Sequence, residues 1–125
     1  MKPVIILRED LPTGLKANFA AVLAMSLGRA HPDLVGTETL AADGASLPGI
    51  TTVPMPVLAA PGAELPALFE AATEMPLRLA YMRAAFKAQS YDDYAARIAT
   101  EPLSKHEPLA LLLAGPRKAV DRVCG

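Results

Sequence analysis

The spacing of apolar residues at the start of the chain predicts a buried strand followed by a long helix. Residues 4–7 form an apolar run without polar alternation, which is typical of a strand covered on both faces. Residues 12–14 then make a turn, and Thr13 is suited to cap the helix that follows. From Leu15 to Leu27, apolar residues occupy nearly every side of this helix, which indicates cover on more than one side. We therefore expect the helix to contact the sheet and also another helix or a second subunit.

The middle of the chain shows little regular periodicity. The turn-forming dipeptide at residues 43–44 indicates a loop, and residues 34–35 fit a short edge strand. Residues 51–58 are rich in β-branched side chains but include Pro54 and Pro56. Because proline has no N–H to donate to a neighbouring strand, this segment is predicted to be an edge strand or an extended connection.

Helical and strand patterns alternate in the second half of the chain. The expected elements are, in order, a helix opened by residues 61–62, a strand at 77–81, a segment at 82–89 that fits either a loop or a helical turn, a helix beginning at Ser90, a central strand at 109–114 and a last helix at 117–124. This order predicts an α/β domain in which helices pack on a small mixed β-sheet.

The composition narrows the class of protein further. The 125 residues are 52% hydrophobic and 20% charged, which suits one folded domain over residues 1–125. Lys and Arg number 12 and Asp and Glu number 13, and the formal net charge of -1 gives no basic footprint for nucleic acid. No apolar run approaches the roughly 18 residues that a membrane helix needs. We expect a soluble cytoplasmic protein without a nucleic-acid or membrane partner.

The sequence offers no cluster of residues for a metal ion or a cofactor. His31 and His106 are far apart, and no group of His, Cys, Asp and Glu has the spacing of metal ligands. Residues 115–118 lack the glycine spacing and the Ser or Thr of a phosphate-binding loop. Cys124 is the only cysteine and has no activating neighbour. We therefore predict neither a metal nor a cofactor.

Charged residues at the end of the first strand mark the candidate site. Arg8 and Asp10 directly follow the buried run and precede the start of a helix. Open α/β sheets place their ligands at this kind of position, outside the carboxyl end of a strand. We therefore assign Arg8 and Asp10 to the binding of a small polar or anionic ligand, with capping of the strand end as the structural alternative.

Lys16 is the candidate catalytic residue and also a candidate ligand-binding residue. It lies in the first helical turn, where a cation faces the positive end of the helix dipole at a cost of about 0.3–1 kcal/mol. Its position on the helix is also on the side of Leu23 and Leu27. A residue that breaks two local rules is a candidate for function. In the alternative interpretation its ammonium group reaches water or pairs with Glu9 or Asp10.

Three further polar residues are candidate ligand contacts, each with a structural alternative. Asn18 follows Lys16 on the helix and either orients a ligand or occupies an exposed position. Gln89 and Ser90 precede a helix whose N-terminus could hold an anion. Ser90 followed by Asp93 also has the spacing of a capping box, which gives Ser90 a structural role.

Several motifs of this chain occur together in one bacterial family. They are Arg-Glu-Asp-Leu-Pro-x-Gly-Leu-Lys-Ala-Asn at residues 8–18, His-Pro-Asp-Leu-Val-Gly at 31–36, Pro-Gly-Ile at 48–50, Pro-Met-Pro-Val-Leu at 54–58 and Gly-Pro-Arg-Lys-Ala-Val at 115–120. Over nearly its whole length the chain resembles the domain-of-unknown-function family numbered two thousand. The resemblance implies a small mixed sheet flanked by helices, similar in fold to the type 2 peptidyl-tRNA hydrolases, and usually a dimer.

The resemblance to these hydrolases covers only part of their functional residues. Their opening segment carries two lysines around a glycine, and here only Lys16 matches. Arg83 stands about where they have an aspartate. Three hypotheses stay open: a protein that binds a small polar or anionic ligand, a divergent hydrolase of an acyl ester, and a non-catalytic homodimeric module whose first helix forms the subunit contact.

Overall fold

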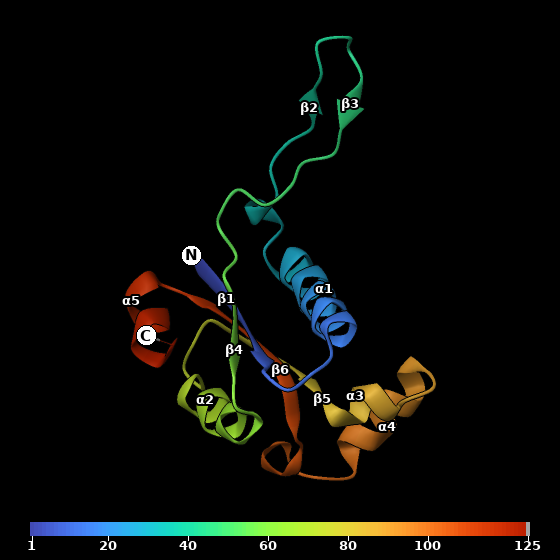
Figure 1. Ribbon diagram of the computed structural model, residues 1–125, viewed down its shortest axis with the longest axis vertical. Helices are drawn as coiled ribbons and strands as arrows, with labels where there is room; N and C mark the ends of the chain where they lie inside the picture. Colours follow the sequence, from blue (N-terminus) through green and yellow to red (C-terminus); the bar gives the residue numbers. More distant parts are fainter. Residues whose placement is uncertain (125) are drawn as a thin grey trace.

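Four strands form one mixed sheet in the computed structural model, which describes residues 1–124 (Figure 1). The strands are β1 (Lys2–Arg8), β4 (Val57–Ala60), β5 (Leu77–Met82) and β6 (Pro108–Gly115), in the order β4-β1-β6-β5. β1 is parallel to β4 and antiparallel to β6, which is antiparallel to β5. The predicted mixed α/β architecture is confirmed, as are the strands expected at residues 4–7, 77–81 and 109–114.

Helices cover both faces of the sheet. α1 (Thr13–Ala30) packs on one face, and α2 (Leu65–Ala71) and α5 (Arg117–Cys124) pack on the other. Because successive strand residues point to opposite faces, each central strand supplies both layers of the core. The layer under α1 contains Ile5, Leu7, Leu112, Phe19, Leu23 and Leu27, and the opposite layer contains Val4, Ile6, Leu111, Leu113, Leu65 and Val120.

The first helix is covered on one side only by the described part of its own chain. Its buried residues are Phe19, Leu23 and Leu27, whereas Val22 is 41% exposed and Met25 is 81% exposed. Another helix, one of the two expectations for α1, covers it only in part within residues 1–124, where Phe86 of α3 (Arg83–Lys87) meets Phe19 edge-on. The contact with a second subunit stays a prediction.

The helix begins differently from the prediction. Pro12 occupies the N-cap position, no side chain caps the helix, and Thr13 is its first helical residue. The Pro12 carbonyl accepts the first helical hydrogen bond from the Lys16 N–H at 3.0 Å. Thr13 therefore lies inside the first turn, and its predicted role as N-cap is wrong.

Two segments of the middle region also differ from their predicted structure. Residues 34–35 do not form a strand, because Pro32 starts the short 3-10 helix η1 (Pro32–Leu34), and Val35 makes only an isolated bridge to Thr51. The predicted edge strand at 51–58 exists but starts only at Val57 and continues to Ala60. The proline N–H groups missing before Val57 explain the late start.

The remaining elements surround one end of the sheet or project from the other. Residues 82–89 contain the short helix α3 (Arg83–Lys87), which decides between the two predicted conformations. α4 (Tyr91–Ala99) follows, and its Asp93–Arg97 ion pair has a length of 3.1 Å. Two further 3-10 helices, η2 (Gly62–Glu64) and η3 (Leu103–Lys105), precede α2 and β6 respectively. β2 (Thr39–Leu40) and β3 (Ser46–Leu47) form a separate hairpin that projects from the body (Figure 1).

None of the helices in residues 1–124 combines the length and the apolar character needed to cross a membrane.

Candidate functional site

Three strand ends meet at one end of the sheet. Because β6 runs antiparallel to both of its neighbours, its first residues lie beside the last residues of β1 and β5. Arg8 ends β1, Glu107 directly precedes β6, and Arg83 directly follows β5. The backbone N–H of Arg83 also donates to the carbonyl of Glu107 at 2.8 Å, which fixes the two segments to each other.

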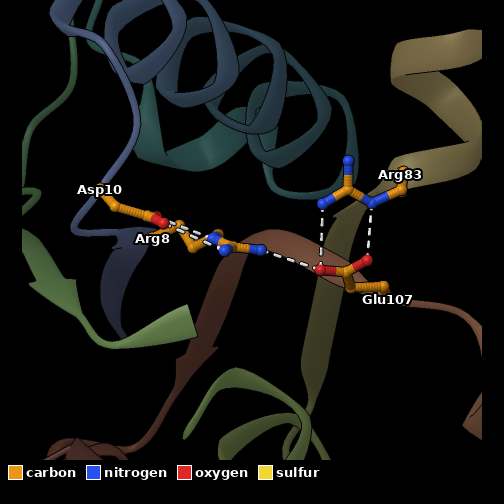
Figure 2. A network of polar contacts seen from close by, with 4 residues as sticks. All are labelled: Arg8, Asp10, Arg83 and Glu107. Atoms are coloured by element: carbon orange, nitrogen blue, oxygen red, sulfur yellow. Dashed lines mark hydrogen bonds and ion pairs between the residues drawn. The ribbon is translucent and has the colours of Figure 1, made fainter. Parts of the chain in front are cut away.

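Four side chains from these strand ends form a continuous polar network (Figure 2). Arg8 donates to Asp10 from Nε at 2.8 Å and from Nη2 at 3.0 Å, and from Nη1 to Oε1 of Glu107 at 2.8 Å. Arg83 donates to Glu107 from Nε at 2.6 Å and from Nη2 at 3.1 Å. Both acidic residues therefore face an arginine in the planar two-bond geometry that guanidinium favours. Glu107 joins the two arginines into one unit.

The backbone at Gly62 lies directly against the Arg8 side chain. A Cβ atom at this position would lie 2.7 Å from Nε and 2.8 Å from Cζ of Arg8. The absent side chain therefore leaves the space that the guanidinium group occupies. The turn between β4 and α2 thereby restricts the orientation of Arg8.

The arginines hold the two carboxylates in their charged form. The hydrogen bond from Arg8 lowers the pKa of Asp10, and the charge of Lys16 adds to this effect. The hydrogen bond from Arg83 lowers the pKa of Glu107, with a further contribution from Arg8. The same contacts raise the pKa of both arginines. All four groups are therefore charged at neutral pH.

A small hollow of about 180 Å³ lies beside the network. Its polar wall consists of Arg8, Asp10 and Arg83, and its apolar wall is formed by Leu11, Leu15, Phe19, Phe86 and Leu109. We call it the arginine hollow.

The apolar wall of the arginine hollow is supported by stacked aromatic rings. Phe19 stacks on Tyr81 with ring centroids 4.1 Å apart, and Phe86 meets Phe19 edge-on at 6.1 Å. A charged wall facing an apolar wall suits a molecule with both kinds of surface.

The structure brings some of the predicted site residues together and separates others. Arg8 and Asp10 both line the arginine hollow. Lys16 is half-buried and close enough to influence the pKa of Asp10, but it forms no ion pair within residues 1–124 and does not line the hollow. Asn18 is exposed on α1, outside the hollow.

The other two predicted contacts lie elsewhere. Gln89 and Ser90 line a different groove, on the other side of Phe19 and Tyr81. Ser90 is the N-cap of α4, because its hydroxyl accepts the N–H of Asp93 at 3.1 Å. The side chain of Asp93 accepts the N–H of Gln89 at 3.0 Å in return. The predicted capping role of Ser90 is confirmed, and its assignment to the same site as Arg8 is not supported by this geometry.

Comparison with known proteins identifies the family of the chain. The sequence model described as "Protein of unknown function (DUF2000)" matches residues 1–125. The chain belongs to DUF2000. A solved structure, that of the protein of unknown function Atu0240 from Agrobacterium tumefaciens strain C58, superimposes with a TM-score of 0.89 at 19% identity, over 98% of this chain and 91% of the other. No curated protein matches the chain.

These comparisons support the family and the fold of this DUF2000 chain. The predicted membership of the family is confirmed. At 19% identity the Agrobacterium protein shows a shared fold and no shared activity, and its printed description gives no function. The similarity to type 2 peptidyl-tRNA hydrolases stays a prediction.

Sequence reasoning did not assign Glu107 or Arg83 of this DUF2000 chain to the site. Both residues lie next to a strand end. Glu107 is 24 positions from Arg83 and 99 positions from Arg8 in the sequence. One sequence signal could have found them: an acidic residue, Glu107, directly precedes the buried run at 108–115, and a basic residue, Arg83, directly follows the strand at 77–82. These positions become neighbours only once β6 is placed between β1 and β5.

Within residues 1–124, no group of three or more His, Cys, Asp and Glu residues is arranged to hold a metal ion.

Proposed function

We propose that this DUF2000 protein binds a small organic anion in the arginine hollow, with the carboxylate or phosphate group of the ligand on Arg83 and its apolar part against Phe19 and Phe86. One observation carries the proposal. Glu107 fixes two of the three guanidinium nitrogens of Arg83, while the third points away from Glu107, toward the side where α1 lies (Figure 2).

The free nitrogen of Arg83 is a donor held ready for an anion. Nη1 has no hydrogen-bond partner within the part of the chain that the structure describes. A guanidinium group whose orientation is already fixed loses less conformational entropy when it binds a carboxylate or phosphate. Because Arg83 lines the hollow together with two phenylalanines, an anion bound there would lie beside an apolar surface.

The balance of charges around the hollow also favours an anion. Arg8 and Arg83 are matched by Asp10 and Glu107, so the four-residue network is neutral. Lys16 adds one positive charge close to Asp10. A ligand with a single negative charge would neutralise this excess. Lys16 therefore supports binding through its charge, from outside the hollow.

The size of the hollow limits the part of the ligand that it can hold. An engineered apolar cavity of about 150 Å³ accepts benzene, and the arginine hollow measures about 180 Å³. A ring or short branched chain with one acidic group is therefore the expected size. A larger molecule would place only its acidic and apolar end in the hollow, which is open to solvent.

The proposal is tested by titrating the protein with benzoate and hexanoate, using benzyl alcohol as an uncharged analogue of benzoate. Arg83→Met should weaken binding of the acids at least about tenfold, because it removes a charged hydrogen bond. Lys16→Ala should weaken it less, and high salt should abolish the difference between wild type and Lys16→Ala. Isothermal titration calorimetry and thermal shifts provide the measurements.

Arg122→Met is the matched control, because Arg122 is an exposed arginine on α5 on the opposite face of the sheet. This variant should bind the acids as the wild type does. Equal affinity of Arg83→Met and wild type for every acid that binds would contradict the proposal, and so would tighter binding of benzyl alcohol than of benzoate.

The alternative of a divergent acyl-ester hydrolase has less support from the geometry. A general base needs a proton affinity near the working pH, whereas arginine contacts lower the pKa of both Asp10 and Glu107. Lys16 would have to supply the chemistry from outside the hollow. Release of an N-blocked amino acid from tRNA, abolished by Lys16→Ala, would favour this alternative over simple binding.

A further inference from the structure

The hairpin of residues 37–50, which we call the arm, projects from the body of the molecule (Figure 1). Its two strands, β2 and β3, pair over only two residues each. Asp43 and Gly44 form its tip, where Gly44 has a φ of 88°, a conformation that glycine adopts without strain. Every residue from 37 to 48 is exposed. The arm therefore packs against no other part of the described chain.

The base of the arm is nevertheless fixed to the body. The N–H of Gly36 donates to Ile50 at 2.8 Å, and the N–H of Thr52 donates to Leu34 at 2.8 Å. Gly49 crosses so close to Gly36 that a Cβ at residue 49 would lie 1.7 Å from the Gly36 carbonyl oxygen. This crossing holds the arm in an outward direction.

The arm exposes apolar side chains on both of its faces. Thr39 pairs with Leu47 and Leu40 pairs with Ser46, so the two leucines point to opposite faces. Leu40 is 71% exposed, Leu47 is 67% exposed and Ile50 at the base is 81% exposed. A hairpin of two strands is at best marginally stable in water on its own. An ordered arm with these side chains is expected to be covered by another surface.

An apolar groove of about 480 Å³ lies elsewhere on the same molecule, between α1 and α4. Val22, Leu79, Tyr91 and Tyr94 are among its lining residues, and Tyr91 is 79% exposed. The groove includes part of β5, which is one of the two edge strands of the sheet. The unpaired N–H and C=O groups of an edge strand can accept a further strand. A β-structured segment is therefore a suitable occupant of this groove.

The arm points away from the groove of its own chain. The arm extends beyond the C-terminal end of α1 and away from the body, whereas α4, which forms one side of the groove, lies beside α3 toward the other end of the molecule (Figure 1). We propose that the arm docks in the groove of a second copy of the chain and that the two copies exchange their arms reciprocally. The contact then obeys two-fold symmetry, in which the same pair of surfaces is used twice.

The number of residues available fits a stable dimer. A standard interface involves about 20–30 residues on each side. Each copy would contribute the 14 residues of the arm (37–50) and the 12 residues that line the groove, which gives 26. Neither surface alone reaches this size, and reciprocal exchange uses both. The exposed Met25 of α1 lies on the helix that borders the groove and would add to the contact.

The first test is the oligomeric state of the full chain, measured by sedimentation over a range of concentrations. The wild type should be a dimer. Leu40→Glu and Leu47→Glu should each raise the dissociation constant at least about 30-fold, the value expected for residues that dominate an interface. Because both side chains are exposed in one copy, these variants should keep the circular dichroism and melting behaviour of the folded protein at low concentration.

Leu103→Glu is the matched control, since Leu103 is an exposed leucine of η3 that lies outside the arm and is not among the residues lining the groove. It should dimerise as the wild type does. A wild type that stays monomeric at high concentration would overturn the proposal. A dimer that Leu40→Glu and Leu47→Glu leave intact would overturn it as well.

The second test locates the partner of the arm directly. Leu47→p-benzoylphenylalanine, activated by light and analysed by mass spectrometry, should form links between two copies at α1, β5 or α4. Links confined to one copy, or links between two arms alone, would contradict docking in the groove. Because the arm is separate from the arginine hollow, binding of benzoate should be unchanged in Leu47→Glu, so failure of either proposal can be recognised independently.

Discussion

At the scale of single residues, Glu107 determines the geometry of the candidate site. Its carboxylate accepts hydrogen bonds from Arg8 and Arg83, and its backbone carbonyl accepts the N–H of Arg83. Exposed ion pairs contribute little to stability individually. The importance of Glu107 is therefore its effect on the orientation of Arg83, which leaves one guanidinium nitrogen available to a ligand.

Replacement of Glu107 should change the pH dependence of stability. The carboxylates of Glu107 and Asp10 have a lowered pKa in the folded protein. Their contribution to stability is therefore complete above the usual carboxyl pKa of about 4 and is lost as the pH falls through the lower, folded-state values. Urea unfolding of the wild type should show this loss on acidification, and Glu107→Gln should show a shallower dependence.

The control for this experiment is Glu101→Gln, because Glu101 is exposed and forms no ion pair within residues 1–124. Its acid dependence should match that of the wild type. If Glu107→Gln and the wild type lost stability in parallel below pH 4, the network would not contribute in the way described.

At the scale of elements, α1 separates two hollows. Phe19 lines the arginine hollow, while Val22 and Leu23 of the same helix line the groove proposed for the arm. α3 has the same arrangement, with Phe86 on one side and Ala85 on the other. The stacked rings of Phe19 and Tyr81 form the boundary between the two spaces.

Truncation of Phe19 should therefore destabilise the protein strongly. Its side chain is only 1% exposed and stacks on Tyr81. Phe19→Ala should lower the free energy of unfolding by about 3–5 kcal/mol, because a buried ring is replaced by a cavity. Met25→Ala on the same helix should change it by less than about 0.5 kcal/mol, since Met25 is exposed in a single copy. Urea unfolding at low protein concentration compares the two variants, and equal losses would contradict this account of α1.

At the scale of the whole molecule, a compact body carries a projecting arm, and the glycine crossing between Gly36 and Gly49 connects them. A side chain at residue 49 cannot be accommodated unless the crossing opens. Gly49→Ala should therefore redirect the arm and lower the free energy of unfolding by about 1–3 kcal/mol, as an overpacked site does. It should also weaken dimerisation if the arm docks in a second copy.

Gly28→Ala provides the contrast, because a Cβ at this helical position meets no atom within 4 Å. The substitution should stabilise the protein by up to about 1 kcal/mol, since alanine favours the helix. Thermal unfolding of the two variants gives the comparison. A neutral Gly49→Ala variant with a wild-type dimer would show that the crossing does not fix the arm.

The amino-acid sequence by itself determined the central part of the fold. Uninterrupted apolar runs predicted β1 and β6, and apolar residues at helical spacing predicted α1. Such patterns are informative because apolar residues recur wherever an element faces the core. Family membership also followed from the sequence motifs. Arg8 and Asp10 were found as neighbours because they are two residues apart at the end of one strand.

Only the tertiary structure decided the rest of the site. Glu107 and Arg83 join Arg8 because β6 lies between β1 and β5, and this strand order is not encoded in any local pattern. Gln89 and Ser90 were separated from Arg8 for the same reason, since α1 and its aromatic contacts lie between them. The outward direction of the arm could not be predicted from the sequence either, because it depends on the backbone crossing between Gly36 and Gly49, which are 13 positions apart. Local periodicity specifies which residues are buried, whereas the packing of strands and helices specifies which polar residues meet.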